Sequence, residues 1–167
     1  MSLSDDLAII GKQEQRLKFL AFNEESAWRL GCRLRDMALA RSAPLVVEVK
    51  RFGQPLFFCA LAGSTPDNLD WARRKANVVA RFHRSSYGMG LELQQKHTTL
   101  ADRFGLALAD FAAHGGAFPI AVAGSGVIGS VAISGLPQRA DHEMVVEALC
   151  GELGCEFAEL RLPDTYA

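Results

Sequence analysis

The sequence predicts an α/β protein of the α+β type, with a central, mostly antiparallel sheet and helices packed on it. Two pairs of short runs rich in Val, Phe, Ile and Leu each flank a glycine turn, which predicts two β-hairpins. Helical stripes lie between these hairpins, so strands and helices do not alternate strictly as they do in parallel sheets. A short run over residues 17–22 adds one strand and gives a predicted five-stranded sheet.

Length, charge and hydropathy limit the class of protein. We expect a single domain over residues 1–167, which can bury about two thirds of its unfolded surface. A net charge of −1 predicts binding neither to nucleic acid nor to an anionic membrane. The apolar runs are shorter than the ~20 residues of a membrane span, and the opening MSLSDD resembles no secretory signal. We therefore expect a cytoplasmic protein whose residues 1–12 are flexible or partly vector-derived.

The first half of the chain predicts a helix and a hairpin. Asn23 suits a helix N-cap, and the apolar residues that follow at helical spacing indicate a helix ending near Ser42. The runs 45–52 and 55–62 then flank Gly53-Gln54 and predict the first hairpin.

The middle of the chain predicts a helix that begins at Ser64-Thr65-Pro66, because a capping hydroxyl precedes a proline at the first helical position. This helix is expected to end at Phe82 or His83. A second helix over 85–95 is weaker, since glycines interrupt it, and residues 98–113 predict no defined element.

The last third contains a string, Gly124-Ser-Gly126-Val-Ile-Gly129, that formally matches the G-x-G-x-x-G pattern of dinucleotide-binding proteins. A pyrophosphate loop lies between a strand and a helix, whose N-terminus binds the phosphates. Here strand patterns stand on both sides, over 118–123 and 127–134, so the glycines predict a hairpin turn. A final helix is expected from Asp141 to Leu153.

Three side chains in these elements suggest chemistry. Lys75 occupies a place in an apolar helical stripe, which predicts either an anion hook or a lysine that snorkels to water. His83 is either a core or capping histidine, or a ligand or proton carrier beside Ser85 and Ser86. His114 precedes two glycines that either let the backbone approach a bound molecule or form a simple turn.

Other polar residues predict structure rather than chemistry. Asp141 and His142 open the last helix, where an aspartate stabilises the helix N-terminus. The four cysteines form no C-x-x-C pair and are expected to be buried thiols. The four histidines have no metal-binding spacing, so the sequence predicts no metal site apart from an iron held within heme.

Several motifs together resemble a known family. WARRKANVVARFHRSS (71–86), HGGAFPI (114–120) and GVIGSVAISGLPQRADHEMV (126–145), with LVVEVKRFGQPLF (45–57) before them, are similar to the HbpS/GlcG-like heme-degrading-domain family. The similarity covers about three quarters of the chain, and it is closest to the branch called uncharacterised protein family 0303. The resemblance implies a profilin-like sandwich and assembly into a homo-oligomer.

The same resemblance implies binding of heme or a related tetrapyrrole, with degradation of heme by some relatives. A bound heme would need an axial side chain and a basic partner for its propionates. His83 or His114 could fill the first role and Lys75 the second, although the family shares no single iron ligand.

Three functions follow as hypotheses. The first is a cytosolic protein that binds a small-molecule ligand, namely heme or a related tetrapyrrole, and whether it turns this ligand over stays open. The second is a module for a small anionic metabolite, with donors from Lys75, Ser134 and the backbone of Gly115 and Gly116. The third is an oligomeric scaffold without catalysis. The candidate ligand-binding residues are Lys75, His83, Ser85, His114, Gly115, Gly116, Phe118 and Ser134.

Overall fold

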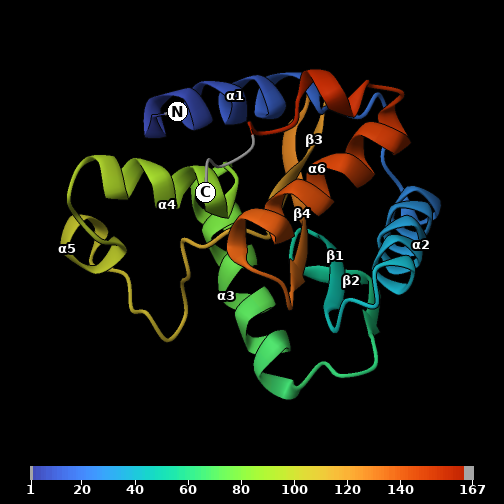
Figure 1. The fold of residues 1–167 in the computed structure, drawn as a ribbon. Coiled ribbons are helices and arrows are strands. Elements are labelled where there is room, and N and C mark those ends of the chain that lie inside the picture. Colours follow the sequence, from blue (N-terminus) through green and yellow to red (C-terminus); the bar gives the residue numbers. More distant parts are fainter. Residues whose placement is uncertain (1, 164–167) are drawn as a thin grey trace.

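The computed structural model describes residues 2–163 and confirms an α+β fold. Figure 1 shows a sheet in the middle of the molecule with helices around it. The helices are α1 (Leu3–Arg16), α2 (Glu24–Ala40), α3 (Pro66–Phe82), α4 (Ser86–Gln95), α5 (Leu100–Phe104) and α6 (Gln138–Leu153), with a short 3-10 turn over Phe157–Glu159. The strands are β1 (Val46–Arg51), β2 (Gln54–Ala60), β3 (Ala117–Val122) and β4 (Gly126–Ser134).

The sheet consists of the two predicted hairpins, joined in the order β2-β1-β4-β3 with every pair antiparallel. The Gly124-Ser-Gly126 segment is the turn of the second hairpin, as predicted. The fifth strand was wrong: within residues 2–163 the sheet has four strands, and the run 17–22 contributes one parallel bridge, Phe19 to Val122. Leu17 caps the end of α1 and Asn23 caps the start of α2, so too little chain lies between them for a strand.

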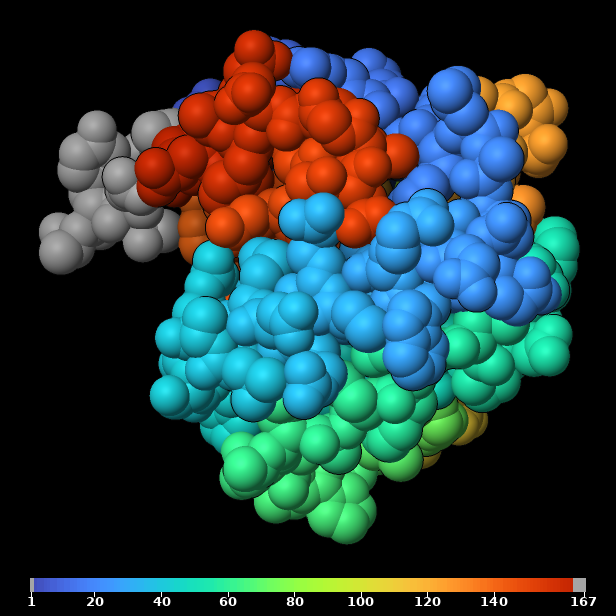
Figure 2. All heavy atoms as spheres, turned by 90° about the vertical axis from the view of Figure 1, so that its right-hand side faces the viewer, coloured from blue at the N-terminus to red at the C-terminus, as the bar shows by residue number. Residues whose placement is uncertain are grey.

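Helices cover both faces of the sheet. The larger core cluster joins α2 and α6 to one face, where Phe118, Val131 and Ile133 are fully buried. On the other face, Ala72 and Ala76 of α3 pack against small residues of the strands. Figure 2 views the molecule from the α2 side, with α6 above that helix. Both faces of the second hairpin are therefore covered within one chain.

The N-terminal segment differs from its prediction of flexibility. Residues 3–16 form α1, which begins with a capping box between Ser2 and Asp5. Ile10 of this helix is fully buried beside Tyr87 and Leu91 of α4. The serine followed three residues later by an acidic residue is a helix-start signal, and it encodes this capping box.

The segment between α3 and β3 holds two helices. The predicted helix over 85–95 is confirmed as α4, despite its glycines. A Cβ atom on Gly90 would lie 2.2 Å from the carbonyl oxygen of Ala113, so the returning chain packs directly on the glycine. Residues 98–113, which predicted no element, contain α5 and a turn.

No helix within residues 2–163 has both the length and the hydropathy that a membrane crossing requires. The cysteines Cys32, Cys59, Cys150 and Cys155 are all free, but only Cys150 is buried, so the prediction of four buried thiols holds for one.

Candidate functional site

A cavity of about 300 Å³ lies where α3, the end of β4 and the start of α6 meet, and we call it the polar cavity. It brings together three of the predicted residues, Lys75, His114 and Ser134. The other polar lining groups include Asp67, Asn68 and Gln138.

The ammonium group of Lys75 is tied to the protein rather than free for an anionic ligand. Its Nζ donates to Asp141 Oδ2 over 2.8 Å and to the carbonyl oxygen of Ile133 over 3.2 Å. Both side chains of the ion pair are buried, at 4% and 1% exposure. Lys75 is thus neither a snorkelling lysine nor an open anion hook, because Asp141 already neutralises its charge.

Burial and pairing act in opposite directions on this ion pair. Loss of solvent lowers the pKa of Lys75, while the nearby carboxylate of Asp141 opposes that change. Burial likewise raises the pKa of Asp141 against the effect of Lys75 and of the backbone N–H of Leu136, which donates to Asp141 Oδ1. Helix α6 begins at Gln138 rather than at the predicted Asp141, and its N-cap is Pro137 without a side-chain cap. Asp141 lies in the first turn of this helix and holds a buried cation.

The two glycines after His114 allow a close approach between backbone segments. A Cβ atom on Gly115 would lie 1.9 Å from the carbonyl oxygen of Gln138, so no side chain fits there. Gly116 has φ +130°, and a Cβ atom on it would lie 2.7 Å from the Nζ of Lys75. Gly115 N–H donates to Gln138 Oε1 and the carbonyl of Gly116 accepts from Ile133. These glycines let the loop pack directly against α6 and against the amine of Lys75, where no side chain would fit.

His114 separates the polar cavity from a second one. Its imidazole packs edge-on against Trp71, with 5.2 Å between ring centroids, and the residue as a whole is exposed. Both rings also line a cavity of about 280 Å³ between α3 and α4, here called the apolar cavity. Partial burial, with Lys75 and Arg74 nearby, lowers the pKa of His114. His114 is therefore a neutral, accessible imidazole between a polar and an apolar hollow.

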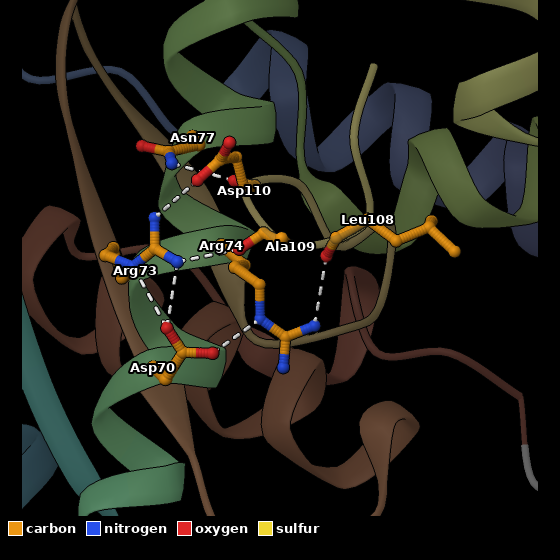
Figure 3. Close-up of polar contacts among 7 residues, drawn as sticks. All are labelled: Asp70, Arg73, Arg74, Asn77, Leu108, Ala109 and Asp110. Carbon is orange, nitrogen blue, oxygen red and sulfur yellow. Dashed lines mark hydrogen bonds and ion pairs between the residues drawn. The ribbon is translucent and has the colours of Figure 1, made fainter. Parts of the chain in front are cut away.

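The apolar cavity is closed on one side by residues 107–111, which two arginines of α3 hold in place (Figure 3). Asp70 pairs with both Arg73 and Arg74, at 2.9 and 2.8 Å. Arg73 also binds Asp110 and the carbonyl oxygen of Ala109, and Asn77 donates to the carbonyl of Asp110. The guanidinium carbon of Arg74 lies 4.0 Å from the centroid of the Trp71 ring, at the edge of this cavity.

His83 lies elsewhere. It caps the C-terminus of α3 with φ +54° and is exposed, which confirms the capping alternative and excludes a buried core histidine. It lines a separate cavity of about 450 Å³ next to the first hairpin turn, together with Lys50 and Phe52. Lys50 is paired with Glu48 at 2.9 Å. The structure therefore does not bring His83 together with Lys75 and His114.

Two further predicted site residues are structural. Ser85 is buried and caps α4: its N–H and its hydroxyl each donate to Glu14 Oε1 at 2.8 Å, and Gly88 N–H donates to its oxygen. Phe118 lies in the core between the sheet and α6, on the face opposite α3. Neither lines the polar or the apolar cavity.

His142 is fully buried next to Asp141 but has another partner. Its Nε2 lies 2.8 Å from Gln13 Oε1, whose amide nitrogen donates to the carbonyl of Leu160. Burial lowers the pKa of His142 to about 3, so the ring stays neutral. His142 therefore joins α6 to α1. Within residues 2–163, no three or more side chains of the types that bind metals lie close enough together to hold an ion.

Sequence reasoning missed several lining residues. Trp71 lies on α3 one helical turn before Lys75, and the apolar character of this helix face gives no sign that Trp71 lines a cavity. Asn68 lies three residues after Thr65 at the start of α3, and its Oδ1 accepts a hydrogen bond from the backbone N–H of Thr65 over 2.8 Å. Its position in the sequence therefore indicates a helix start rather than a cavity. Gln138 has no local signal, because only the close approach of the glycine loop places it at the cavity.

The family model described as "Haem degrading protein HbpS-like" matches residues 22–150. Among curated relatives, a UPF0303 protein of Acidobacterium capsulatum is 56% identical over 163 residues, which cover 98% of this chain and 99% of the relative. A UPF0303 protein of Burkholderia mallei is 60% identical over 162 residues, covering 97% and 98% of the two chains.

Solved structures share the fold. The crystal structure of the Ybr137w protein is 28% identical with a TM-score of 0.82, over 89% of this chain and 87% of that one. HbpS is 21% identical with a TM-score of 0.63, over 80% and 90%. A heme complex of PduOC is 17% identical with a TM-score of 0.65, over 79% and 94%.

Proposed function

This chain belongs to the HbpS-like family, and we propose that it binds heme or a related tetrapyrrole next to His114. The observation that supports this site is the position of His114 at the wall between the apolar and polar cavities. A structural relative crystallised as a heme complex, PduOC, supports the class of ligand.

The residues around His114 suit the chemistry of a heme. A neutral imidazole is a common iron ligand, and the lowered pKa keeps His114 in that form at neutral pH. The apolar cavity offers a surface for a flat macrocycle, with walls from Trp71, Leu93, Leu100, Leu108 and Phe111. Its volume lies near the small end of ligand pockets, which hold about 300–1,000 Å³, so one edge of the macrocycle would enter.

Arg74 is the better partner for a ligand carboxylate than Lys75. The charge of Lys75 is cancelled by Asp141 inside the protein, whereas Arg74 pairs with an Asp70 whose side chain is 46% exposed. Because the Asp70 carboxylate is half-exposed, solvent screens this ion pair in part, and a ligand carboxylate can share the Arg74 guanidinium with it. We therefore reassign the propionate role from Lys75 to Arg74.

A bound heme would supply an iron centre, and the chain would supply the pocket around it. The neutral imidazole of His114 would hold the iron, Trp71 would fix the orientation of that imidazole, and Leu108 and Phe111 would shield one side. Arg73 and Asn77 hold that loop and thus act as positioning residues.

Titration with hemin tests this site, followed by the Soret band in the wild type and two histidine variants. His83→Ala is the matched control because His83 lines a different cavity. We expect saturable binding by the wild type and by His83→Ala. For His114→Ala, loss of the iron ligand should weaken binding at least about tenfold, or ~1.4 kcal/mol.

Two results of this titration would contradict the proposal. If His83→Ala lost the Soret change and His114→Ala kept it, the ligand would belong to the cavity at the first hairpin. If the wild type behaved like an unrelated protein of similar size, the chain would not bind heme as proposed.

The same family resemblance leads us to expect a homo-oligomer. Strand β2 is an edge of the sheet in the described chain, and its Phe58 is 48% exposed, as unprotected edges that pair with another copy often are. Light scattering of the wild type should give a mass that is a multiple of the 18.1 kDa of one chain. The Phe58→Lys variant should give a smaller mass than the wild type. A monomeric wild type at micromolar concentration would refute this expectation.

A further inference from the structure

We propose that Lys75 reacts reversibly with small, neutral, hydroxylated aldehydes or ketones in the polar cavity and forms a Schiff base. This inference concerns the cavity on the other side of the Trp71–His114 wall, and it does not depend on heme binding.

The first argument is the position of the amine. Lys75 is almost completely buried, yet it lines a cavity of about 300 Å³. An ammonium group has three N–H donors, and the contacts to Asp141 and Ile133 use two of them. Gly116 packs closely on Nζ, where a Cβ atom would lie 2.7 Å away, so access to the amine comes from the side of Lys75 that lines the polar cavity. A ligand carbonyl in the cavity therefore has access to the nitrogen.

The second argument is the partner that can take the proton. Asp141 Oδ2 lies 2.8 Å from Nζ, so one proton can move from the ammonium group to the carboxylate without any change in structure. Burial lowers the pKa of Lys75 and raises the pKa of Asp141, and both changes favour this transfer. A desolvated lysine of this kind is a typical nucleophile toward carbonyl carbon.

The reaction balances without any oxidant or reductant. The nitrogen lone pair forms a bond to the carbonyl carbon, and the carbonyl oxygen takes the proton from Asp141 to give a carbinolamine. Its hydroxyl group then leaves with a proton from the nitrogen as water, and a C=N double bond forms. A protonated Schiff base carries the same single positive charge as the original ammonium group, so Asp141 keeps its counterion.

The lining of the cavity determines the class of carbonyl compound. Ser134, Asn68 and Gln138 offer hydroxyl and amide groups, and the carboxylate of Asp67 can accept from ligand hydroxyls. Lys75 and Asp141 cancel each other, so Asp67 gives the cavity a negative balance that disfavours a carboxylate on the ligand. The structure thus favours a neutral polyhydroxy carbonyl compound over the anionic metabolite considered from the sequence.

Trapping with a reductant tests the inference on the wild-type protein. We would incubate the protein with dihydroxyacetone and cyanoborohydride at neutral pH and map the reduced adducts by peptide mass spectrometry. The expected result is more adduct on Lys75 than on the exposed Lys12 and Lys18 together, although Lys75 is the buried one. Pyruvate, which carries a carboxylate, should label Lys75 less than dihydroxyacetone does.

The Lys75→Gln variant provides the second readout, since glutamine keeps a donor for Asp141 but has no amine. Loss of the selective adduct in Lys75→Gln, with labelling of Lys12 and Lys18 unchanged, would support the site. Adducts confined to the exposed lysines of the wild type would overturn the inference, and this result needs no variant to fold. Heme titration is a separate measurement, so the failure of one proposal leaves the other tested on its own.

Discussion

Replacing Asp141 by asparagine is expected to lower the free energy of unfolding by about 3–5 kcal/mol, the usual effect of leaving a buried ion without its partner. Lys75 is 3% exposed and has no other carboxylate among its hydrogen-bond partners in the described chain. The loss should shrink as pH rises, because a neutral Lys75 no longer needs a counterion. Urea denaturation of the wild type and of Asp141→Asn at a series of increasing pH values would measure both the loss of stability and its dependence on pH.

Two controls separate the buried pair from a general effect of losing a charge. Asp70→Asn removes an exposed partner of Arg73 and Arg74 and should cost at most about 1 kcal/mol. The double variant Lys75→Met/Asp141→Asn should recover much of the stability lost by Asp141→Asn, since no unpaired charge stays buried. If Asp141→Asn were as mild as Asp70→Asn, the ion pair would not hold α3 to α6 as described.

Replacing Phe118 by alanine should cost about 3–5 kcal/mol, because it leaves a cavity in a packed core. Its ring is 1% exposed and lies between the sheet and α6, with 6.0 Å to the centroid of the His142 ring. Under conditions in which the Phe118→Ala variant is still folded, it should bind heme as the wild type does, since Phe118 lines neither cavity.

Thermal or urea unfolding of Phe118→Ala is best compared with Phe52→Ala. Phe52 is 80% exposed at the first hairpin turn, so its truncation should change stability by no more than about 0.5 kcal/mol. Loss of heme binding by a stably folded Phe118→Ala variant would contradict the structural role and would restore Phe118 as a ligand-binding residue.

The elements that local signals encode were predicted well. Pro66 after a capping threonine placed the start of α3, and the strand pattern on both sides of Gly124-Ser-Gly126 showed the hairpin. The missed elements depend on tertiary contacts instead. Helix α1 gains its stability by packing Ile10 on α4, and the run 17–22 is too short to be a strand between two helix caps.

The site shows the same limit. The sequence predicted either an anion hook or a snorkelling lysine at position 75, and spacing along the chain could not show that Asp141, 66 residues away, is its partner. The resemblance suggested His83 as an iron ligand with Lys75 as the propionate partner, whereas His83 caps α3 at its exposed end and lines a different cavity. The glycines after His114 were predicted either to let the backbone approach a bound molecule or to form a simple turn, and in the structure Gly115 approaches the backbone of Gln138.

The most direct test of the heme site is chemical rescue of His114→Gly, followed by the absorption spectrum of ferric heme with and without imidazole. If His114 is the axial ligand, the variant should lose the wild-type Soret maximum and regain it in a saturable way when imidazole is added. The assignment would be contradicted if His114→Gly showed the wild-type spectrum before imidazole is added. It would also be contradicted if imidazole left the His114→Gly spectrum unchanged while the control His83→Gly gave the wild-type spectrum.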